Sequence, residues 1–204
     1  MRKTRIFLIR HGETLWNLEQ RCQGFTDIAL SERGLEQAKR LARYLSKIAR
    51  LSAIYSSDLI RARKTAEVIA EAYRLEVQID ARLRELNQGR LEGKNLMNML
   101  EEYPELLEKW MNNAKEVIMP GGESIIQLQA RAWQAFSEII ERHQGMEIAI
   151  VSHNMCNITI LCKLLDIDLN NFRRLKQSSA ALNEIEIGPR GAVILRLNDT
   201  HFLD

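Results

Sequence analysis

The chain has 204 residues, of which 46% are hydrophobic, and a formal net charge of +2. This length and composition suffice to bury one sizeable core, so we expect a single domain over residues 1–204. Because 29 basic residues are interleaved with 27 acidic ones, we expect no large basic face. The composition therefore argues against binding to nucleic acid or to an anionic membrane surface.

The cysteines indicate a reducing compartment. Cys22, Cys156 and Cys162 contain no Cys-x-x-Cys pair and cannot all be paired within one chain, which argues against a secreted disulfide scaffold. The apolar run at the amino end covers only residues 6–9, far fewer than the ~20 residues of a membrane helix. We therefore expect a cytoplasmic protein.

The amino-terminal third alternates between strands and helices. The short apolar, β-branched run at 5–10 predicts a buried strand that ends at Arg-His-Gly. Ser31 can cap a helix whose apolar residues recur at helical spacing up to Ile48. Residues 52–55 predict a second strand, and we expect Asp58 to cap the helix that follows.

The middle of the chain is less regular. Residues 75–79 alternate like a strand, whereas 82–93 contain too many polar residues and glycines for a strand or a helix. Residues 95–113 have a helical pattern that Pro104 interrupts. We therefore expect a small helical insertion at about 94–120.

The last part repeats the strand-to-helix pattern. Ser124 can cap a long amphipathic helix that stops at Gly145. Residues 147–152 predict a second strongly apolar strand, which leads directly into His153, and a helix is expected at 156–165.

The carboxyl-terminal segment 181–197 predicts a hairpin. Its apolar residues fit either an internal sheet edge or a homodimer contact. The order of elements as a whole predicts an α/β fold: a three-layer α/β/α sandwich with a mostly parallel sheet, one antiparallel edge strand and the helical insertion over the site.

Two predicted strands end at a histidine. Ligand sites in such sheets lie beyond the carboxyl ends of the strands, where Arg10, His11 and His153 are expected. Arginine matches the oxygens of phosphate, and a neutral imidazole can act as a nucleophile toward phosphorus. An Arg-His pair alone is weak support, because charged residues at a strand end are commonly just solvated.

The motifs taken together are more specific. They span residues 5 to about 160 and resemble, in order, those of the histidine phosphatase (phosphoglycerate-mutase-like) superfamily. The matching segments are Leu8-Ile9-Arg10-His11-Gly12-Glu13-Thr14 with Asn17, Gln23-Gly24 with Asp27, Leu30-Ser31 to Gly34, Ser56-Ser57-Asp58-Leu59-Ile60-Arg61-Ala62, Leu83-Arg84-Glu85 with Gly89 and Glu92-Gly93, Pro120-Gly121-Gly122-Glu123-Ser124, and Val151-Ser152-His153.

The resemblance implies a role for each matching residue. His11 would be the nucleophile that is transiently phosphorylated, and a backbone acceptor in the turn after it would fix its tautomer. Glu85 would be the general acid and base, and His153 would bind the phosphoryl group as a cation when phosphate is present. The residues implied in phosphate binding are Arg10, Asn17, Gln23, Gly24, Arg61 and Asn154. Neither a metal nor another cofactor is implied.

The alternative for Glu85 is a surface carboxylate that pairs with Arg82 or Arg84. Leu91 stands where the family often has Trp, which implies an altered pocket shape rather than another mechanism. Two other departures favour a phosphatase over a bisphosphoglycerate-dependent mutase: residues 154–158 lack the arginine typical of the mutases, and 95–119 contain no cluster of arginines.

The layout is similar to α-ribazole phosphatases, broad-specificity phosphatases and metal-independent phosphoserine phosphatases, which implies a small-molecule phosphate ester as the partner. A mutase and a catalytically silent phosphate-binding adaptor remain alternatives, although an adaptor would be expected to have lost His11 or Glu85. Four apolar residues of the insertion either line the substrate pocket or pack the insertion itself; they are Met97, Met99, Trp110 and Met111.

Overall fold

A six-stranded sheet forms the middle layer of the computed structural model, which describes residues 3–204. The strands are β1 (Thr4–Arg10), β2 (Leu51–Ser56), β3 (Val77–Ile79), β4 (Glu147–Ser152), β5 (Leu182–Gly188) and β6 (Gly191–Asp199). They lie in the order β3-β2-β4-β1-β5-β6, and the first four run parallel. Strand β5 pairs antiparallel with both β1 and β6. The predicted sheet with an antiparallel edge is confirmed, with β5 as the reversed strand and β6 at the edge.

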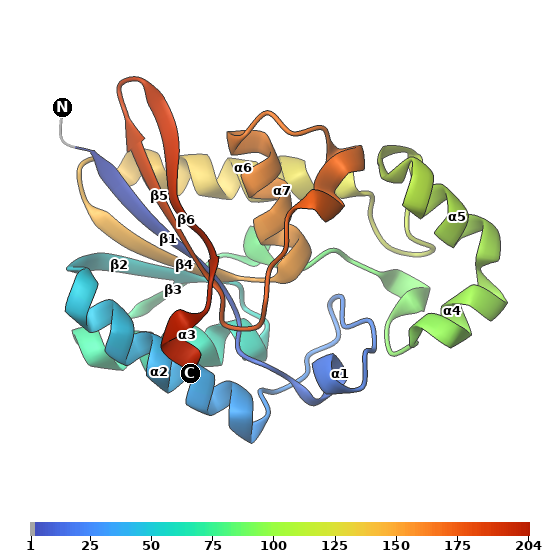
Figure 1. Cartoon of the computed structure of the whole chain (residues 1–204), viewed down its shortest axis with the longest axis horizontal. Helices are drawn as coiled ribbons and strands as arrows, with labels where there is room; N and C mark the ends of the chain where they lie inside the picture. Colours follow the sequence, from blue (N-terminus) through green and yellow to red (C-terminus); the bar gives the residue numbers. More distant parts are fainter. Residues whose placement is uncertain (1–2) are drawn as a thin grey trace.

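Helices cover both faces of the sheet (Figure 1). Those on one face are α2 (Glu32–Ile48) and α3 (Ile60–Tyr73), and those on the other are α6 (Ile125–Arg142) and α7 (Asn154–Leu164). The central strand β1 is apolar on both sides: Phe7 and Ile9 pack with α2 and α3, while Ile6 and Leu8 pack with α6 and α7. Because a strand alternates its side chains, an uninterrupted apolar run is what a doubly covered sheet requires.

Two predicted helix caps are confirmed. The hydroxyl of Ser31 accepts a hydrogen bond from the backbone N–H of Gly34 at 3.0 Å. That of Ser124 accepts one from Gln127 at 3.2 Å, and the Gln127 side chain returns a bond to the Ser124 backbone. Both caps satisfy N–H groups that the first helical turn leaves without partners.

The predicted cap of α3 by Asp58 is wrong. The carboxylate of Asp58 instead accepts hydrogen bonds from the guanidinium of Arg84. The first N–H of α3, from Ile60, donates to Asp27 Oδ1 at 2.7 Å, across 33 positions of the chain. A long-range carboxylate has therefore replaced the local one. The helix predicted at 156–165 also begins two residues early, with His153 at its N-cap.

The insertion contains α4 (Leu96–Glu102) and α5 (Pro104–Asn112), and the short α1 is Leu15–Leu18. Pro104 is the first residue of α5, so the predicted interruption is confirmed. The insertion and α1 lie at one end of the molecule, beyond the carboxyl ends of the parallel strands (Figure 1). Short 3-10 turns lie at Ala81–Leu83, Gly89–Leu91, Ala114–Glu116, Leu169–Arg174 and His201–Leu203.

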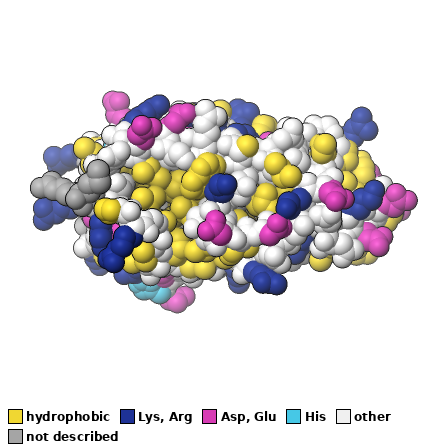
Figure 2. All heavy atoms as spheres, turned by 90° about the horizontal axis from the view of Figure 1, so that it is seen from above, with side chains coloured by type: hydrophobic (Ala, Val, Ile, Leu, Met, Phe, Trp, Pro, Cys, Tyr) yellow, Lys and Arg dark blue, Asp and Glu magenta, His cyan; other side chains and the backbone are white. Residues whose placement is uncertain are grey.

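Figure 2 shows one face of the molecule, on which hydrophobic side chains gather along the middle while acidic and basic side chains are scattered. On the edge strand β6, Val193, Leu195 and Leu197 are 53%, 49% and 44% exposed. Within residues 3–204, no helix is both long enough and apolar enough to cross a bilayer.

Candidate active site

Adjacent parallel strands bring the two histidines together. Arg10 at the end of β1 is in register with Ser152 at the end of β4, so the next residue on each strand emerges at the same edge. The backbone N–H of His11 donates to Ser152 O at 3.0 Å. The ring centroids of His11 and His153 are 5.2 Å apart, and the two residues are only 2% and 0% exposed.

The environment of His11 fixes its chemical form. Its Nδ1 lies 2.6 Å from the carbonyl oxygen of Gly12. Because a carbonyl can only accept, Nδ1 carries the hydrogen and Nε2 keeps its lone pair. Burial above all, and then the positive charges of Arg61 and Arg10, hold the pKa of His11 well below its usual value. His11 is therefore a neutral imidazole at pH 7 with a free ring nitrogen, as expected for a nucleophile.

Arg61 is fully buried on α3 and holds the neighbouring loop. Its guanidinium donates to the carbonyl oxygens of Thr26 at 2.9 Å and Gly24 at 2.7 Å. Gly24 has φ +53°, and a Cβ there would lie 2.1 Å from Glu92 Oε1, so any other residue would be strained and would displace the Glu92 carboxylate. Burial lowers the pKa of Arg61 to about 10, which leaves it positively charged at neutral pH.

Several buried polar atoms at this edge have no hydrogen-bond partner within residues 3–204. They are Arg10 Nε, Arg61 Nε and both ring nitrogens of His153. Burial, followed by the charge of Arg61, also holds the pKa of His153 well below its usual value. Buried polar groups in folded proteins nearly always have partners, so this cluster is suited to an anion with several acceptor oxygens. We call Arg10, His11, Arg61 and His153 the phosphate cradle.

Glu85 lies beside the cradle and is 9% exposed. Its carboxylate accepts the backbone N–H groups of Leu86 at 2.9 Å, Met155 at 3.0 Å and Cys156 at 3.2 Å. Two of these donors belong to the first turn of α7, whose N–H groups are free to bind an acidic side chain.

The surface pairing considered for Glu85 is absent from the described residues. Arg84 pairs with Asp58, and Arg82 pairs with Asp80 and Glu138. Both arginines are therefore engaged away from Glu85, which leaves its carboxylate buried at the α7 N-terminus.

The remaining residues implied in phosphate binding have mixed surroundings. Asn17 Oδ1 accepts the backbone N–H of Thr14 at 3.0 Å, as part of a capping box on α1. Gln23 Oε1 is buried without a hydrogen-bond partner in the described chain. Asn154 is the half-buried first residue of α7. The structure therefore assigns a local structural role to the Asn17 oxygen and leaves its amide group as a donor.

Residues that support the cradle were missed by the sequence analysis. The carboxylate of Glu92 accepts the backbone N–H groups of Phe25 at 2.8 Å and Thr26 at 2.9 Å, as well as the Thr26 hydroxyl. Gln177 O accepts a guanidinium N–H of Arg10. Glu92 belongs to a quoted motif, but nothing local indicates its bonds to the loop at 25–26.

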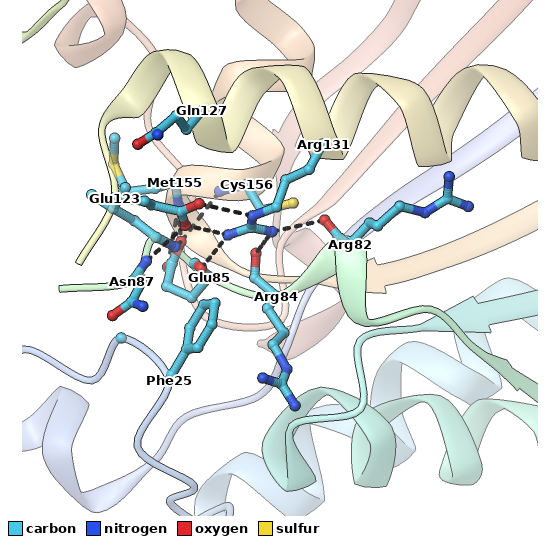
Figure 3. A network of polar contacts seen from close by, with 12 residues as sticks. Phe25, Arg82, Arg84, Glu85, Asn87, Glu123, Gln127, Arg131, Met155 and Cys156 are labelled. Carbon is cyan, nitrogen blue, oxygen red and sulfur yellow. Dashed lines mark hydrogen bonds and ion pairs between the residues drawn. The ribbon is translucent and has the colours of Figure 1, made fainter. Parts of the chain in front are cut away.

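Arg131 on α6 was also missed (Figure 3). It donates to the carbonyl oxygens of Arg82 at 2.7 Å, Arg84 at 2.8 Å and Glu85 at 2.6 Å, and it pairs with Glu123. Carbonyl acceptors are present in every residue, so such contacts leave no signal in a sequence.

The apolar residues of the insertion divide. Met97 is 72% exposed, whereas Met99, Trp110 and Met111 line a cavity of about 260 Å³ between α4, α5 and the turn at 169–174. The Trp110 ring packs on Phe172 at 5.2 Å between centroids. Among residues 3–204, no group of three or more His, Cys, Asp and Glu side chains is placed to hold a metal ion.

A buried histidine pair, two arginines and a carboxylate at the carboxyl edge of a parallel sheet form an arrangement suited to phosphoryl transfer. The family model of the histidine phosphatase superfamily (branch 1) matches residues 6–200. The chain belongs to this superfamily, as its motifs predicted.

Known relatives cover most of the chain. Phosphoserine phosphatase 1 of Hydrogenobacter thermophilus is 38% identical over 96% of this chain and 92% of its own length. A protein named probable phosphoglycerate mutase GpmB from Escherichia fergusonii is 35% identical over 89% of this chain and 84% of its own length. The solved structure of Bacillus stearothermophilus YhfR superposes with a TM-score of 0.92 at 30% identity, covering 98% of this chain and 100% of that one. Superfamily membership and these relatives support phosphatase activity in this chain.

Proposed function

We propose that this protein hydrolyses a small-molecule phosphate monoester through a phosphohistidine on His11, without a metal ion. The single observation that carries the proposal is the bond from His11 Nδ1 to Gly12 O at 2.6 Å. This bond leaves Nε2 as the basic nitrogen of a buried, neutral ring, and a nucleophile toward phosphorus needs that lone pair.

In the first step, His11 Nε2 attacks phosphorus in line with the ester oxygen. The nitrogen–phosphorus bond forms as the phosphorus–oxygen bond to the leaving group breaks. Glu85 gives a proton to the leaving oxygen, which departs as an alcohol.

In the second step, water attacks the phosphohistidine. Glu85, now ionised, takes a proton from that water, the bond between phosphorus and Nε2 breaks, and inorganic phosphate leaves. Glu85 thus alternates between acid and base, and His11 returns to its starting form.

The phosphate cradle stabilises the negative charge in both steps. The unpartnered Nε groups of Arg10 and Arg61 and the ring of His153 supply donors that are already buried and in place, so little reorganisation is needed when phosphate binds. A bound dianion favours the protonated form of His153. We assign secondary contacts with the phosphate to Asn17, Gln23, Gly24 and Asn154.

We further propose that residues 1–204 form one catalytic domain, with the insertion at about 94–120 beside the leaving group. The relatives favour two candidate reactions, because one is named a phosphoserine phosphatase and another a phosphoglycerate mutase. Hydrolysis is the reaction proposed here. A mutase would instead keep the phosphoryl group on the enzyme and require a bisphosphate primer.

The test is phosphate release from p-nitrophenyl phosphate, phosphoserine and 3-phosphoglycerate with EDTA present, alongside a mutase assay with bisphosphoglycerate. We expect wild-type release to survive EDTA and His11→Ala to lose it by on the order of 10⁴-fold or more. His201→Ala is the matched control, because that histidine is exposed near the carboxyl end. Full, EDTA-resistant activity in a folded His11→Ala variant would refute the proposal, and isomerisation without release would establish the mutase.

A further inference from the structure

We propose that Arg131 is a positioning residue that fixes the acid Glu85 by clamping the backbone of residues 82–87. This inference rests on the proposed function, because it assumes that Glu85 transfers protons. It concerns a residue outside the phosphate cradle: none of the hydrogen bonds of Arg131 within residues 3–204 goes to a cradle residue.

Every N–H of the Arg131 guanidinium has an acceptor. Its Nε donates to Glu123 Oε2 at 3.0 Å, and Nη1 donates to the carbonyl oxygens of Arg82 and Arg84. Its Nη2 donates to the carbonyl oxygen of Glu85 at 2.6 Å and to Glu123 Oε1. A planar group with five fixed donors therefore holds three carbonyls of one short, irregular segment, which no ammonium group can reproduce.

Glu123 extends the clamp to the far end of the segment. Its Oε1 accepts the backbone N–H of Asn87 at 2.8 Å, and its own N–H donates to Asn87 O at 3.1 Å. Glu123 directly precedes Ser124, the N-cap of α6, and Arg131 lies two turns along the same helix. Helix α6 and the residue before its N-cap thus hold both ends of the acid-bearing segment (Figure 3).

Glu85 is consequently held through both its backbone and its side chain. Arg131 binds its backbone carbonyl, while N–H groups of α7 bind its carboxylate, at 3.0 Å in the case of Met155. The clamp also reaches the loop that Arg61 holds, because the Phe25 ring lies 5.0 Å from the guanidinium carbon of Arg84 and 5.7 Å from that of Arg131. An acid must meet the leaving oxygen within hydrogen-bond reach, so a displacement of about 1 Å is costly.

The experiment compares Arg131→Lys and Arg131→Met with Glu85→Gln on two substrates. Phosphoserine has a poor leaving group that needs the acid, whereas p-nitrophenolate leaves with little protonation. We expect Glu85→Gln and both Arg131 variants to lose on the order of 10²-fold in kcat/KM on phosphoserine but less than about threefold on p-nitrophenyl phosphate. Arg142→Met is the matched control, since Arg142 lies on the same helix with its side chain 61% exposed and, among the described residues, forms an ion pair with Glu138.

A double variant separates positioning from general structural support. If Arg131 acts through Glu85, the combination of Arg131→Lys with Glu85→Gln should be no slower on phosphoserine than Glu85→Gln alone, because the two residues form one unit. In hydrogen exchange, amides 83–87 should exchange faster in Arg131→Lys than in wild type, whether or not substrate turns over.

The inference is overturned if the Arg131 variants lose as much kcat/KM on p-nitrophenyl phosphate as on phosphoserine. It is also overturned if the losses of Arg131→Lys and Glu85→Gln multiply in the double variant. If the Arg131→Met variant does not fold, Arg131→Lys and Glu123→Gln decide the question by the same comparison of kcat/KM losses on the two substrates. The proposed function fails separately: in that case Glu85→Gln itself shows no difference between the two leaving groups. If Glu85→Gln shows a difference between the two leaving groups but Arg131→Lys and Glu123→Gln do not, then Glu85 is the acid and Arg131 does not position it.

Discussion

The phosphate cradle and the Arg131 clamp lie at the same end of the sheet and are both rich in arginine, but they use their donors in opposite ways. In the cradle, Arg10 Nε, Arg61 Nε and both ring nitrogens of His153 are buried without partners in the described chain. In the clamp, all five N–H groups of Arg131 are bonded within the protein.

This difference separates two functions of a buried charged group. A donor without a partner costs stability, because it has lost its water and gained nothing in return. A donor whose every N–H is bonded contributes to stability and has nothing left to offer a ligand. We therefore expect the unpartnered donors of the cradle to contribute to catalysis with little benefit to folding, and the fully bonded supporting groups to contribute to stability.

The sharpest test of the cradle is His153→Phe, which keeps a ring of similar size. We expect kcat/KM to fall on the order of 10³-fold, because one of the donors to the transferring phosphoryl group is lost. At the same time the free energy of unfolding at pH 7.5 should stay equal or rise, since two unsatisfied buried nitrogens are replaced by carbon. Urea unfolding and steady-state kinetics measure the two effects. A large loss of stability would show that His153 is part of the scaffold.

The converse test is Glu92→Gln, which changes the side chain that binds the loop at residues 25–26. The carboxylate accepts bonds from Phe25 and Thr26 with its two oxygens, and an amide can keep only part of them because an NH2 donor replaces one of the oxygens. We expect the free energy of unfolding to fall by about 2 kcal/mol. The loss of kcat/KM should stay near tenfold, smaller than for His153→Phe.

Glu105→Gln is a suitable control for Glu92→Gln, because Glu105 is an exposed acid on α5. An activity loss as large as that of His153→Phe, without any change in stability, would place Glu92 in the cradle instead.

The same contrast explains what the sequence could predict. The strands that deliver His11 and His153 are continuous apolar runs, and their periodicity is local. The caps by Ser31 and Ser124 are local as well, because each involves residues three positions apart. The family resemblance then named the cradle, since its residues stand in short motifs.

The supporting contacts were not predictable for a physical reason. Asp27 replaces Asp58 at the start of α3 from 33 positions away. Arg131 and Glu92 bind mainly backbone groups, which every residue carries. Only the folded chain determines which carbonyls and N–H groups approach these side chains, so composition and spacing contain no record of them.

The last prediction concerns pH and uses the two histidines of the cradle. The pKa of each is held well below its usual value in the folded chain, mainly by burial, whereas an unfolded histidine has a pKa near 6.5. As the pH falls below about 6.5 the unfolded chain binds protons that the folded chain refuses, so stability present above that pH is lost. Each histidine should account for about 1–2 kcal/mol of the loss between pH 7.5 and pH 5.

Comparison of variants isolates this effect from the acidic side chains. Carboxylates such as Asp58 and Asp80, whose pKa is lowered by arginine partners, also lose stability in acid, but they are unchanged in every variant and cancel. Unfolding by urea at pH 7.5 and pH 5 should therefore show a smaller acid loss for His153→Phe than for wild type. Saturating inorganic phosphate should weaken the acid loss in wild type, because the anion favours a protonated His153. An identical loss in wild type and His153→Phe would contradict the prediction, because it would mean that burial of His153 costs no stability in acid.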